Sequence, residues 1–189
     1  MRWLHIYLSM FGLAAVLFFS VTGITLNHPD WFFGEAERHV ESEGRMEHKW
    51  LHSDRPEAEV AKLEVVEHLR KAHAIRGALV EFRVDERECV VTFKGPGSSA
   101  DAFIDRDSGR YNLTQSYHGF IAVMNDLHKG RDTGPVWSVL IDLSAVLMTL
   151  IALTGLVLLF YLKLRRGPGL VVTAIGAIVV VAVVLIWVP

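Results

Sequence analysis

The stretch Trp3–Leu26, WLHIYLSMFGLAAVLFFSVTGITL, decides the class of this fold. It contains no Asp, Glu, Lys or Arg. As a helix it would be about 36 Å long, enough to cross a hydrocarbon core of about 30 Å. Two further apolar runs, Val136–Leu162 and Leu170–Val188, are also long enough. The sequence therefore predicts an α-helical membrane protein with three transmembrane helices. A cleaved signal peptide is the alternative for the first run, but the run is long for a signal sequence and lacks a clear Ala-x-Ala site.

Charge separates a polar middle from two apolar ends. Only five charged residues lie outside Asp30–Asp132, namely Arg2, Asp142, Lys163, Arg165 and Arg166. The net charge of −2 gives no basic surface for nucleic acid. The single cysteine, Cys89, cannot form an internal disulfide, and no Cys-x-x-Cys-His motif exists for covalent haem attachment.

The basic residues beside the spans predict the orientation. Arg2 and the basic turn at Lys163–Arg166 flank the spans on one side, and short basic flanks stay cytoplasmic. We expect a bacterial inner-membrane protein in lipid, with a cytoplasmic N-terminus and a periplasmic C-terminus. The expected segments are the first span at residues 1–28, a periplasmic domain at 29–133, the second span with a cytoplasmic turn at 134–166, and the third span at 167–189.

The middle segment predicts a small α+β domain. Apolar residues recur at helical spacing over Pro56–Ala74, with Asp54 as a candidate N-cap. Short β-branched and aromatic runs predict three strands, at Ala78–Val84, Cys89–Phe93 and Ala102–Asp105. One helix on a three-stranded antiparallel sheet is expected. Residues 29–56 are predicted to be a loop or short hairpin, and Leu113–Lys129 an amphipathic helix returning to the membrane.

Two of the nine histidines are placed to share a ligand. His28 follows the outer end of the first span, and His128 lies eight residues before the second, so we expect both at similar depth. Two imidazoles from different helices can clamp a haem iron, and bis-imidazole ligation suits electron transfer because no iron position stays open. The alternative is that each is an interfacial histidine bonded to solvent or to a backbone carbonyl.

The other histidines are weaker candidates. His118 lies ten residues before His128, about 15 Å along a helix. His5 lies at the inner end of the first span with no second histidine near that surface. The spacing of His48 and His52 would suit zinc or copper on a helix, but their segment is more typical of a solvated loop.

Polar residues within the spans allow several interpretations. Asp142 could orient a haem-ligating histidine, pair with Arg131, or stay hydrated near the surface. The first two spans share a Thr-Gly pair, at Thr22-Gly23 and Thr154-Gly155. Because glycine permits close helix approach and threonine bonds back to its own helix, a packing role is the preferred interpretation.

Several motifs resemble one known family, the PepSY-associated transmembrane helix family. They are Arg2-Trp3-Leu4-His5, Ser20-Val21-Thr22-Gly23-Ile24-Thr25-Leu26-Asn27-His28-Pro29, Asn125-Asp126-Leu127-His128-Lys129-Gly130-Arg131, Ile141-Asp142-Leu143-Ser144-Ala145 and Leu153-Thr154-Gly155-Leu156. The predicted helix and three strands are similar to the PepSY module. The resemblance covers roughly residues 2–166.

The resemblance implies a membrane protein with non-covalent b-type haem. Some family members reduce ferric siderophores, and others are linked to electron transfer in iron uptake. Carried over, His28 and His128 become the expected axial ligands, with His118 or His5 as candidates for another site. The expectation is an electron-transfer protein for ferric siderophores or an extracytoplasmic redox partner. It would be a ferric-siderophore reductase or its electron-transfer subunit. The alternative is a non-redox PepSY-type regulatory or assembly protein with structural histidines.

An inner haem would need a second His5. A homodimer could supply it, because Gly12, Ala14, Ala15 and Gly23 permit close packing of the first span. The alternatives are that these residues pack within the chain and that electrons arrive from an extracytoplasmic donor. No Gly-x-Gly-x-x-Gly fingerprint is present for NADH or flavin.

Overall fold

The computed structural model describes residues 1–31, 36–51 and 60–189 of the chain. The chain divides into two compact units, one formed by Met1–Phe18 with Asp142–Pro189 and the other by Phe19–Ile141. The first unit is made of apolar helices, and the second contains the polar middle of the chain.

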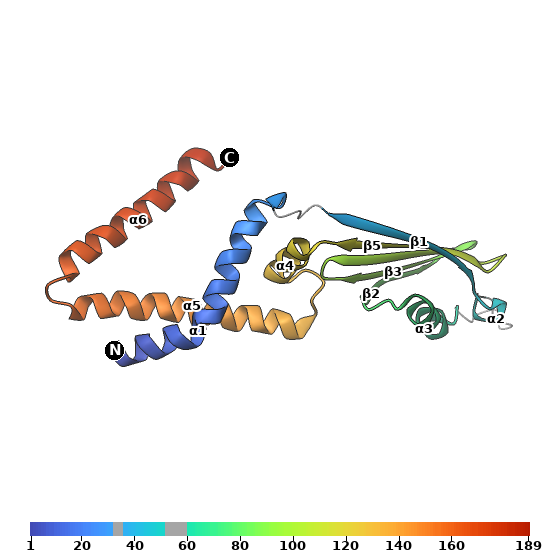
Figure 1. The fold of residues 1–189 in the computed structure, drawn as a ribbon, viewed down its shortest axis with the longest axis horizontal. Helices are drawn as coiled ribbons and strands as arrows, with labels where there is room; N and C mark the ends of the chain where they lie inside the picture. The colour runs from blue at the N-terminus through green and yellow to red at the C-terminus, as the bar shows by residue number, and fades with distance from the viewer. Residues whose placement is uncertain (32–35, 52–59) are drawn as a thin grey trace. The chain divides into compact units, whose positions relative to one another are not determined.

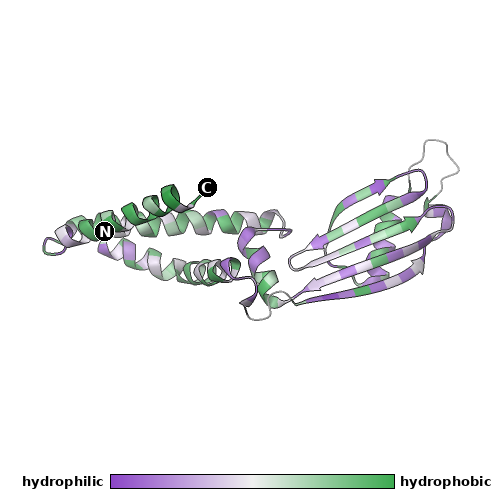
Figure 2. Cartoon of the chain, turned by 90° about the horizontal axis from the view of Figure 1, so that it is seen from above, coloured by the Kyte–Doolittle hydropathy of each residue, from purple (hydrophilic) through white to green (hydrophobic). Residues whose placement is uncertain are grey.

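Three long apolar helices confirm the predicted spans. They are α1 (Arg2–Asn27), α5 (Pro135–Tyr161) and α6 (Arg166–Trp187), and each is long and apolar enough to cross a membrane (Figures 1 and 2). Within the first unit α1 approaches α5 closely at Gly12, where an added Cβ would lie 2.7 Å from Ile151 Cδ1. This glycine, expected to permit a dimer contact, is used within the chain.

The second unit contains a five-stranded antiparallel sheet rather than the predicted three strands. The strands are β1 (Glu37–Arg45), β2 (Ala78–Val84), β3 (Glu88–Gly95), β4 (Ser98–Asp105) and β5 (Arg110–His118), in the order β1-β5-β4-β3-β2. The three predicted strands correspond to β2, β3 and β4. Pro96-Gly97 closes the β3–β4 hairpin, with Gly97 at a φ of 64°.

Strand β5 occupies the first part of the predicted return helix, so that prediction was wrong for these residues. Tyr111, Leu113 and Gln115 are buried while the residues between them are not, which is the period of two of a strand with one face covered. The helix that does form there, α4 (Phe120–Lys129), begins only after Gly119. It ends at Gly130, whose φ of 69° allows its N–H to cap the last carbonyls.

Strand β1 lies where a loop or short hairpin was expected. Its sequence, ERHVESEGR, has one large apolar residue and therefore no readable hydrophobic period. Its conformation is fixed by pairing with β5 along nine residues. Charged residues on such an edge strand discourage pairing with another chain.

One helix covers one face of the sheet, as predicted. Helix α3 (Lys62–His73) lies along the sheet (Figure 1) and contributes Val65 and Leu69 to the core. The predicted N-cap Asp54 and the start at Pro56 lie outside the described residues. A short helix, α2 (His48–Leu51), precedes α3 and buries Leu51. The largest fully buried side chains of this core are those of Phe93, Leu51, Leu69, Ile104 and Leu113.

Candidate functional site: two histidine seats

Each Thr-Gly pair of the first two spans faces an imidazole from another helix. Thr22-Gly23 of α1 faces His128 of α4, and Thr154-Gly155 of α5 faces His5 of α1. We call these arrangements the His128 seat and the His5 seat. The His128 seat belongs to the second unit and the His5 seat to the first.

The His128 seat joins α4 to α1. The His128 Nδ1 atom lies 2.6 Å from the hydroxyl oxygen of Thr22, whose side chain is buried. Phe19 meets the imidazole edge-on, with ring centroids 5.2 Å apart. A Cβ on Gly23 would lie 3.7 Å from His128 Cε1, an ordinary contact distance. The ring is therefore held at one nitrogen and packed against an aromatic side chain.

A second polar contact, one helical turn away, fixes the same two helices. The Thr25 hydroxyl donates to the Asn125 side-chain oxygen at 2.8 Å, and the Asn125 amide lies 3.4 Å from the Thr25 carbonyl oxygen. Both side chains are buried. Sequence reasoning did not identify this pair. A signal for it was present, because Asn125 and His128 are three residues apart, as are Thr22 and Thr25, and that spacing puts each pair on one helix face.

The His5 seat shows which ring nitrogen carries the proton. His5 Nδ1 lies 3.0 Å from the Thr154 hydroxyl oxygen. That hydroxyl donates its only hydrogen to carbonyls of its own helix, 2.8 Å from Leu150 O and 3.0 Å from Ile151 O. With that hydrogen on a carbonyl, the oxygen accepts a hydrogen bond from His5, and we infer from this arrangement that Nδ1 is protonated. A neutral His5 ring therefore keeps the lone pair on Nε2.

Gly155 leaves room for the His5 ring. A Cβ at this position would lie 3.1 Å from His5 Cε1, closer than side-chain atoms normally pack. The packing role expected for the Thr-Gly pairs is thus seen, and what the pairs pack against is a histidine.

The contacts of His28 are with its neighbours in the sequence. The His28 ring is stacked on Trp31, with centroids 4.0 Å apart and planes 7° apart. Thr22, which contacts His128, lies six residues before His28, about 9 Å along the helix. In the described residues no hydrogen bond or ring contact joins the two imidazoles, although similar depth was expected.

His118 and Asp142 lie in settings other than those expected. His118 is the last residue of β5, not part of a helix with His128, and its Nε2 lies 3.8 Å from a Glu37 carboxylate oxygen. Asp142 is exposed on α5. Arg131, one of its candidate partners, instead lies 3.7 Å from Asp126.

No cluster of three or more His, Cys, Asp or Glu side chains suited to a metal ion occurs in the part of the chain that the structure describes. His48 lies 2.8 Å from the Asp107 carbonyl oxygen, and His52 is outside the described residues. Each seat, as defined by its contacts, contains one histidine. Any ligand they hold must supply its other bonds itself or take them from a second histidine.

Fold and sequence together define a membrane protein of the PepSY-associated type. The family described as "Putative PepSY_TM-like" matches residues 1–189, and the chain belongs to this family. The resemblance seen in the sequence is thereby confirmed. No curated protein and no solved structure matches the chain.

Proposed function

We propose that this chain is a haem-binding membrane electron-transfer protein. The observation that carries the proposal is the presentation of the two imidazoles. Each is fixed through Nδ1 by a threonine hydroxyl of a facing helix, which leaves Nε2 available to a ligand. Histidines that ligate metals in proteins are commonly fixed in this way through their other nitrogen. The donor set therefore fits a cofactor that needs neutral imidazole.

His128 is the first candidate ligand for a non-covalent b-type haem. Its seat combines the Thr22 hydroxyl with the edge of Phe19, and apolar side chains suit a porphyrin. His28 is the candidate for the opposite ligand, and His5 belongs to a separate seat. His118 is less suited, because it lies on the sheet beside a carboxylate. Bound haem would supply one-electron transfer, and the threonines would keep the imidazoles oriented and in one tautomer.

The proposed location is the bacterial inner membrane, with residues 29–133 in the periplasm. The basic flanks at Arg2 and Lys163–Arg166 support this orientation. A periplasmic reporter fused after Gly109 and a cytoplasmic one fused at Arg166 should both be active. The opposite pattern would overturn the orientation.

The resemblance to the family extends the proposal to iron uptake. The electron acceptor would be a ferric siderophore or another extracytoplasmic redox partner, and the chain would act as a reductase or its electron-transfer subunit. A homodimer remains part of the proposal, because a second copy would bring a second His5 to an inner site. Haem stoichiometry and mass in detergent test it: a monomer with one haem, unchanged by His5→Ala, would exclude a shared inner haem.

A non-redox regulatory or assembly role is the second candidate, and one observation favours it. Helix α4 joins the sheet to α1: the Gly97 N–H donates to the Asp126 carboxylate at 2.9 Å, and Asn125 on the same helix binds Thr25. A movement of the β3–β4 hairpin would thus be transmitted to a span. In this role the histidines serve only to form hydrogen bonds between helices.

The absorption spectrum of the purified protein separates the two candidates. Haem binding predicts a Soret band that shifts on reduction with dithionite. His128→Ala should remove the haem or make it high-spin, while His118→Ala, the matched control outside the seats, should leave the spectrum unchanged. A colourless protein after expression with ample haem, or wild-type low-spin spectra in both His28→Ala and His128→Ala, would overturn the assignment.

A further inference from the structure

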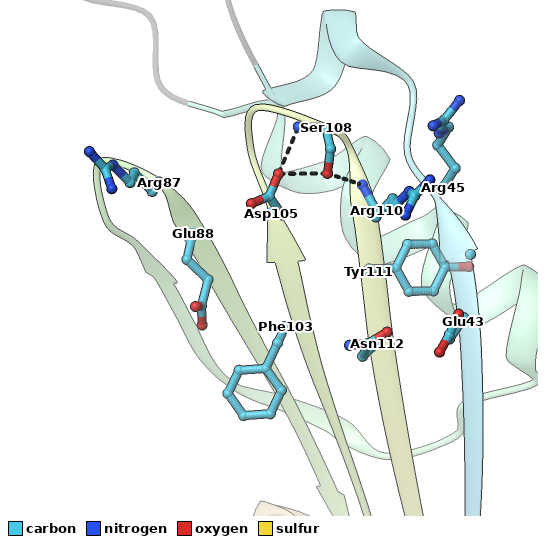
Figure 3. A pocket seen from close by; sticks show the side chains of 11 residues that line it. Glu43, Arg45, Arg87, Glu88, Phe103, Asp105, Ser108, Arg110, Tyr111 and Asn112 are labelled. Atoms are coloured by element: carbon cyan, nitrogen blue, oxygen red, sulfur yellow. Dashed lines mark hydrogen bonds between the residues drawn. The ribbon is translucent and has the colours of Figure 1, made fainter.

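The face of the sheet opposite α3 contains a polar pocket of about 830 Å³. It lies at the end of the sheet formed by the β2–β3 and β4–β5 turns, among side chains of β1, β3, β4 and β5 (Figure 3). Its volume is in the range of small-molecule sites. None of its lining residues belongs to either histidine seat, so a ligand in this pocket would bind independently of haem.

Two arginines face each other at one end of this pocket. Arg45 of β1 and Arg110 of β5 are direct cross-strand partners, and both are exposed. Like charges directly opposite on one face of a sheet are destabilising. Neither guanidinium has a carboxylate within 4.0 Å among the described residues, whereas Arg83 on the same face is paired with Asp85. An anionic group between Arg45 and Arg110 would relieve this repulsion.

Hydrogen bonds in the β4–β5 turn hold Arg110 in place. The Asp105 carboxylate accepts the Ser108 hydroxyl at 2.6 Å and the Ser108 N–H at 2.7 Å, and the Ser108 oxygen lies 3.3 Å from the Arg110 N–H (Figure 3). These bonds lower the pKa of Asp105, so it stays ionised and committed to the turn. Both bonds from Ser108 reach the Asp105 Oδ1 atom, and they fix the turn that precedes Arg110, while Arg45 is the last residue of β1.

The opposite end of the pocket is acidic. Glu88 of β3 faces Asp105 across the sheet, and the described residues offer Glu88 no basic partner within 4.0 Å. In Figure 3 Glu88 extends toward the level of Phe103, while the guanidinium of the neighbouring Arg87 turns outward. Across this row of the sheet, Glu88 and Asp105 therefore lie on one side and Arg110 and Arg45 on the other. Glu43 and Arg87 also line the pocket.

Phe103 supplies an apolar surface beside the row that joins these two ends, since the β4 residue between Glu88 and Arg110 in that row is Asp105. Phe103 is 49% exposed and lies among mainly polar lining residues. Figure 3 shows it between Glu88 on one side and Asn112 and Glu43 on the other. From Glu88 on β3 to Arg110 on β5 is two strand spacings, about 10 Å.

We propose that this pocket binds a short zwitterionic peptide that lies across the strands. Its terminal carboxylate lies between Arg45 and Arg110, its amino end lies at Glu88, and an apolar side chain rests on Phe103. Three extended residues span about 10 Å, which matches the separation of the charges. The planar fork of arginine suits a carboxylate particularly well.

Calorimetric titration of the full chain in detergent with the tripeptide Ala-Phe-Ala tests the proposal. Arg110→Gln should weaken binding at least fivefold, while Arg83→Gln, the matched control on the same face, should leave it unchanged. Amidation of the peptide carboxylate should weaken binding as much as Arg110→Gln does. Combining the two changes should weaken binding little further, because both remove the same interaction. In the same way, N-acetylation of the peptide should weaken binding as much as Glu88→Gln does.

Four outcomes would overturn the proposal. They are no binding at peptide concentrations up to about 10 mM, equal losses in Arg110→Gln and Arg83→Gln, additive losses from amidation and Arg110→Gln, and binding of benzoate as tight as that of the tripeptide. Phe103→Leu separates folding from binding. It keeps an apolar surface, so it should retain most of the affinity, whereas Phe103→Ser should lose several-fold. Without ligand, Arg110→Gln should not lower the unfolding temperature, because it removes the repulsion from Arg45.

Discussion

The two histidine seats differ in how much space separates the glycine from the imidazole ring. The same substitution, glycine to alanine, can therefore be compared at the two positions. In Gly155→Ala the new methyl group would lie 3.1 Å from His5 Cε1. In Gly23→Ala it would lie 3.7 Å from His128 Cε1. The same chemical change is thus made on two apolar helices, and only one of them forces the imidazole to move.

The magnitudes follow from these distances. To reach an ordinary contact the His5 ring must withdraw by about 0.3 Å, which would stretch its 3.0 Å bond to Thr154 beyond the usual range. Hydrogen bonds between membrane helices contribute about 0.6 kcal/mol. Replacing glycine by alanine within a helix gains about 1 kcal/mol. Gly155→Ala should therefore change the free energy of unfolding by less than about 0.5 kcal/mol. Gly23→Ala should raise it by close to the full value of about 1 kcal/mol that alanine gains over glycine in a helix.

The decisive measurement is the imidazole itself. In ¹⁵N NMR spectra of the protein in detergent, the His5 ring should show a protonated Nδ1, and this signal should shift or broaden in Gly155→Ala alone. Thermal unfolding in the same detergent supplies the stability difference. If Gly23→Ala and Gly155→Ala have the same effect on their histidines, or if His5 carries its proton on Nε2, the assigned geometry of the seats is wrong.

Three further predictions concern the second unit. Gly44→Ala would place a methyl group 2.3 Å from the buried ring of Tyr111 and should lower the free energy of unfolding by about 1–3 kcal/mol; a urea-unfolding loss below about 0.5 kcal/mol would contradict this. Burial lowers the pKa of His73, whose Nε2 lies 2.9 Å from the Tyr111 hydroxyl, so the folded domain resists its protonation. The neutral His73 ring stabilises the folded domain fully above a pH of about 6.5, and this stabilisation is lost as the pH falls through the lower pKa of the folded state. The urea concentration at the unfolding midpoint should therefore be lower at pH 5.5 than at pH 7.5, and the difference should be smaller in His73→Gln. Asn125→Ala removes the Asn125 oxygen from the Thr25 hydroxyl, which keeps the Thr22 carbonyl oxygen at 3.0 Å as an acceptor, and should cost about 1 kcal/mol. Thermal unfolding measures this loss, and an unchanged unfolding temperature would show that the contact does not fix α4 to α1.

The local sequence predicted the elements of the fold that depend on composition or on short-range periodicity. The spans were predictable because transfer of apolar side chains into lipid adds up residue by residue along α1, α5 and α6. Strands β2, β3 and β4 were predictable because each contains β-branched or aromatic residues. Helix α3 was predictable from its apolar spacing, although it begins at Lys62 rather than at Pro56.

The remaining elements depend on partners distant in the chain. Strand β1 has no hydrophobic period and exists through its ladder with β5, while β5 was mistaken for a helix because isolated apolar residues fit either period over a short window. The candidate site shows the same division. The sequence alone provided the nine histidines and the likeness of the two Thr-Gly pairs.

Only the tertiary structure decided which histidine meets which threonine. His128 and Thr22 are 106 residues apart, and His5 and Thr154 are 149 residues apart. Such pairs leave no trace in local spacing, because a hydrogen bond between two helices depends on their rotation and depth as packed. In that packing the face of α1 that contains Thr22 contacts His128, and His28 is stacked on Trp31. The sequence by itself determined the membrane class and the residue types available for a site, and helix packing determined their partners.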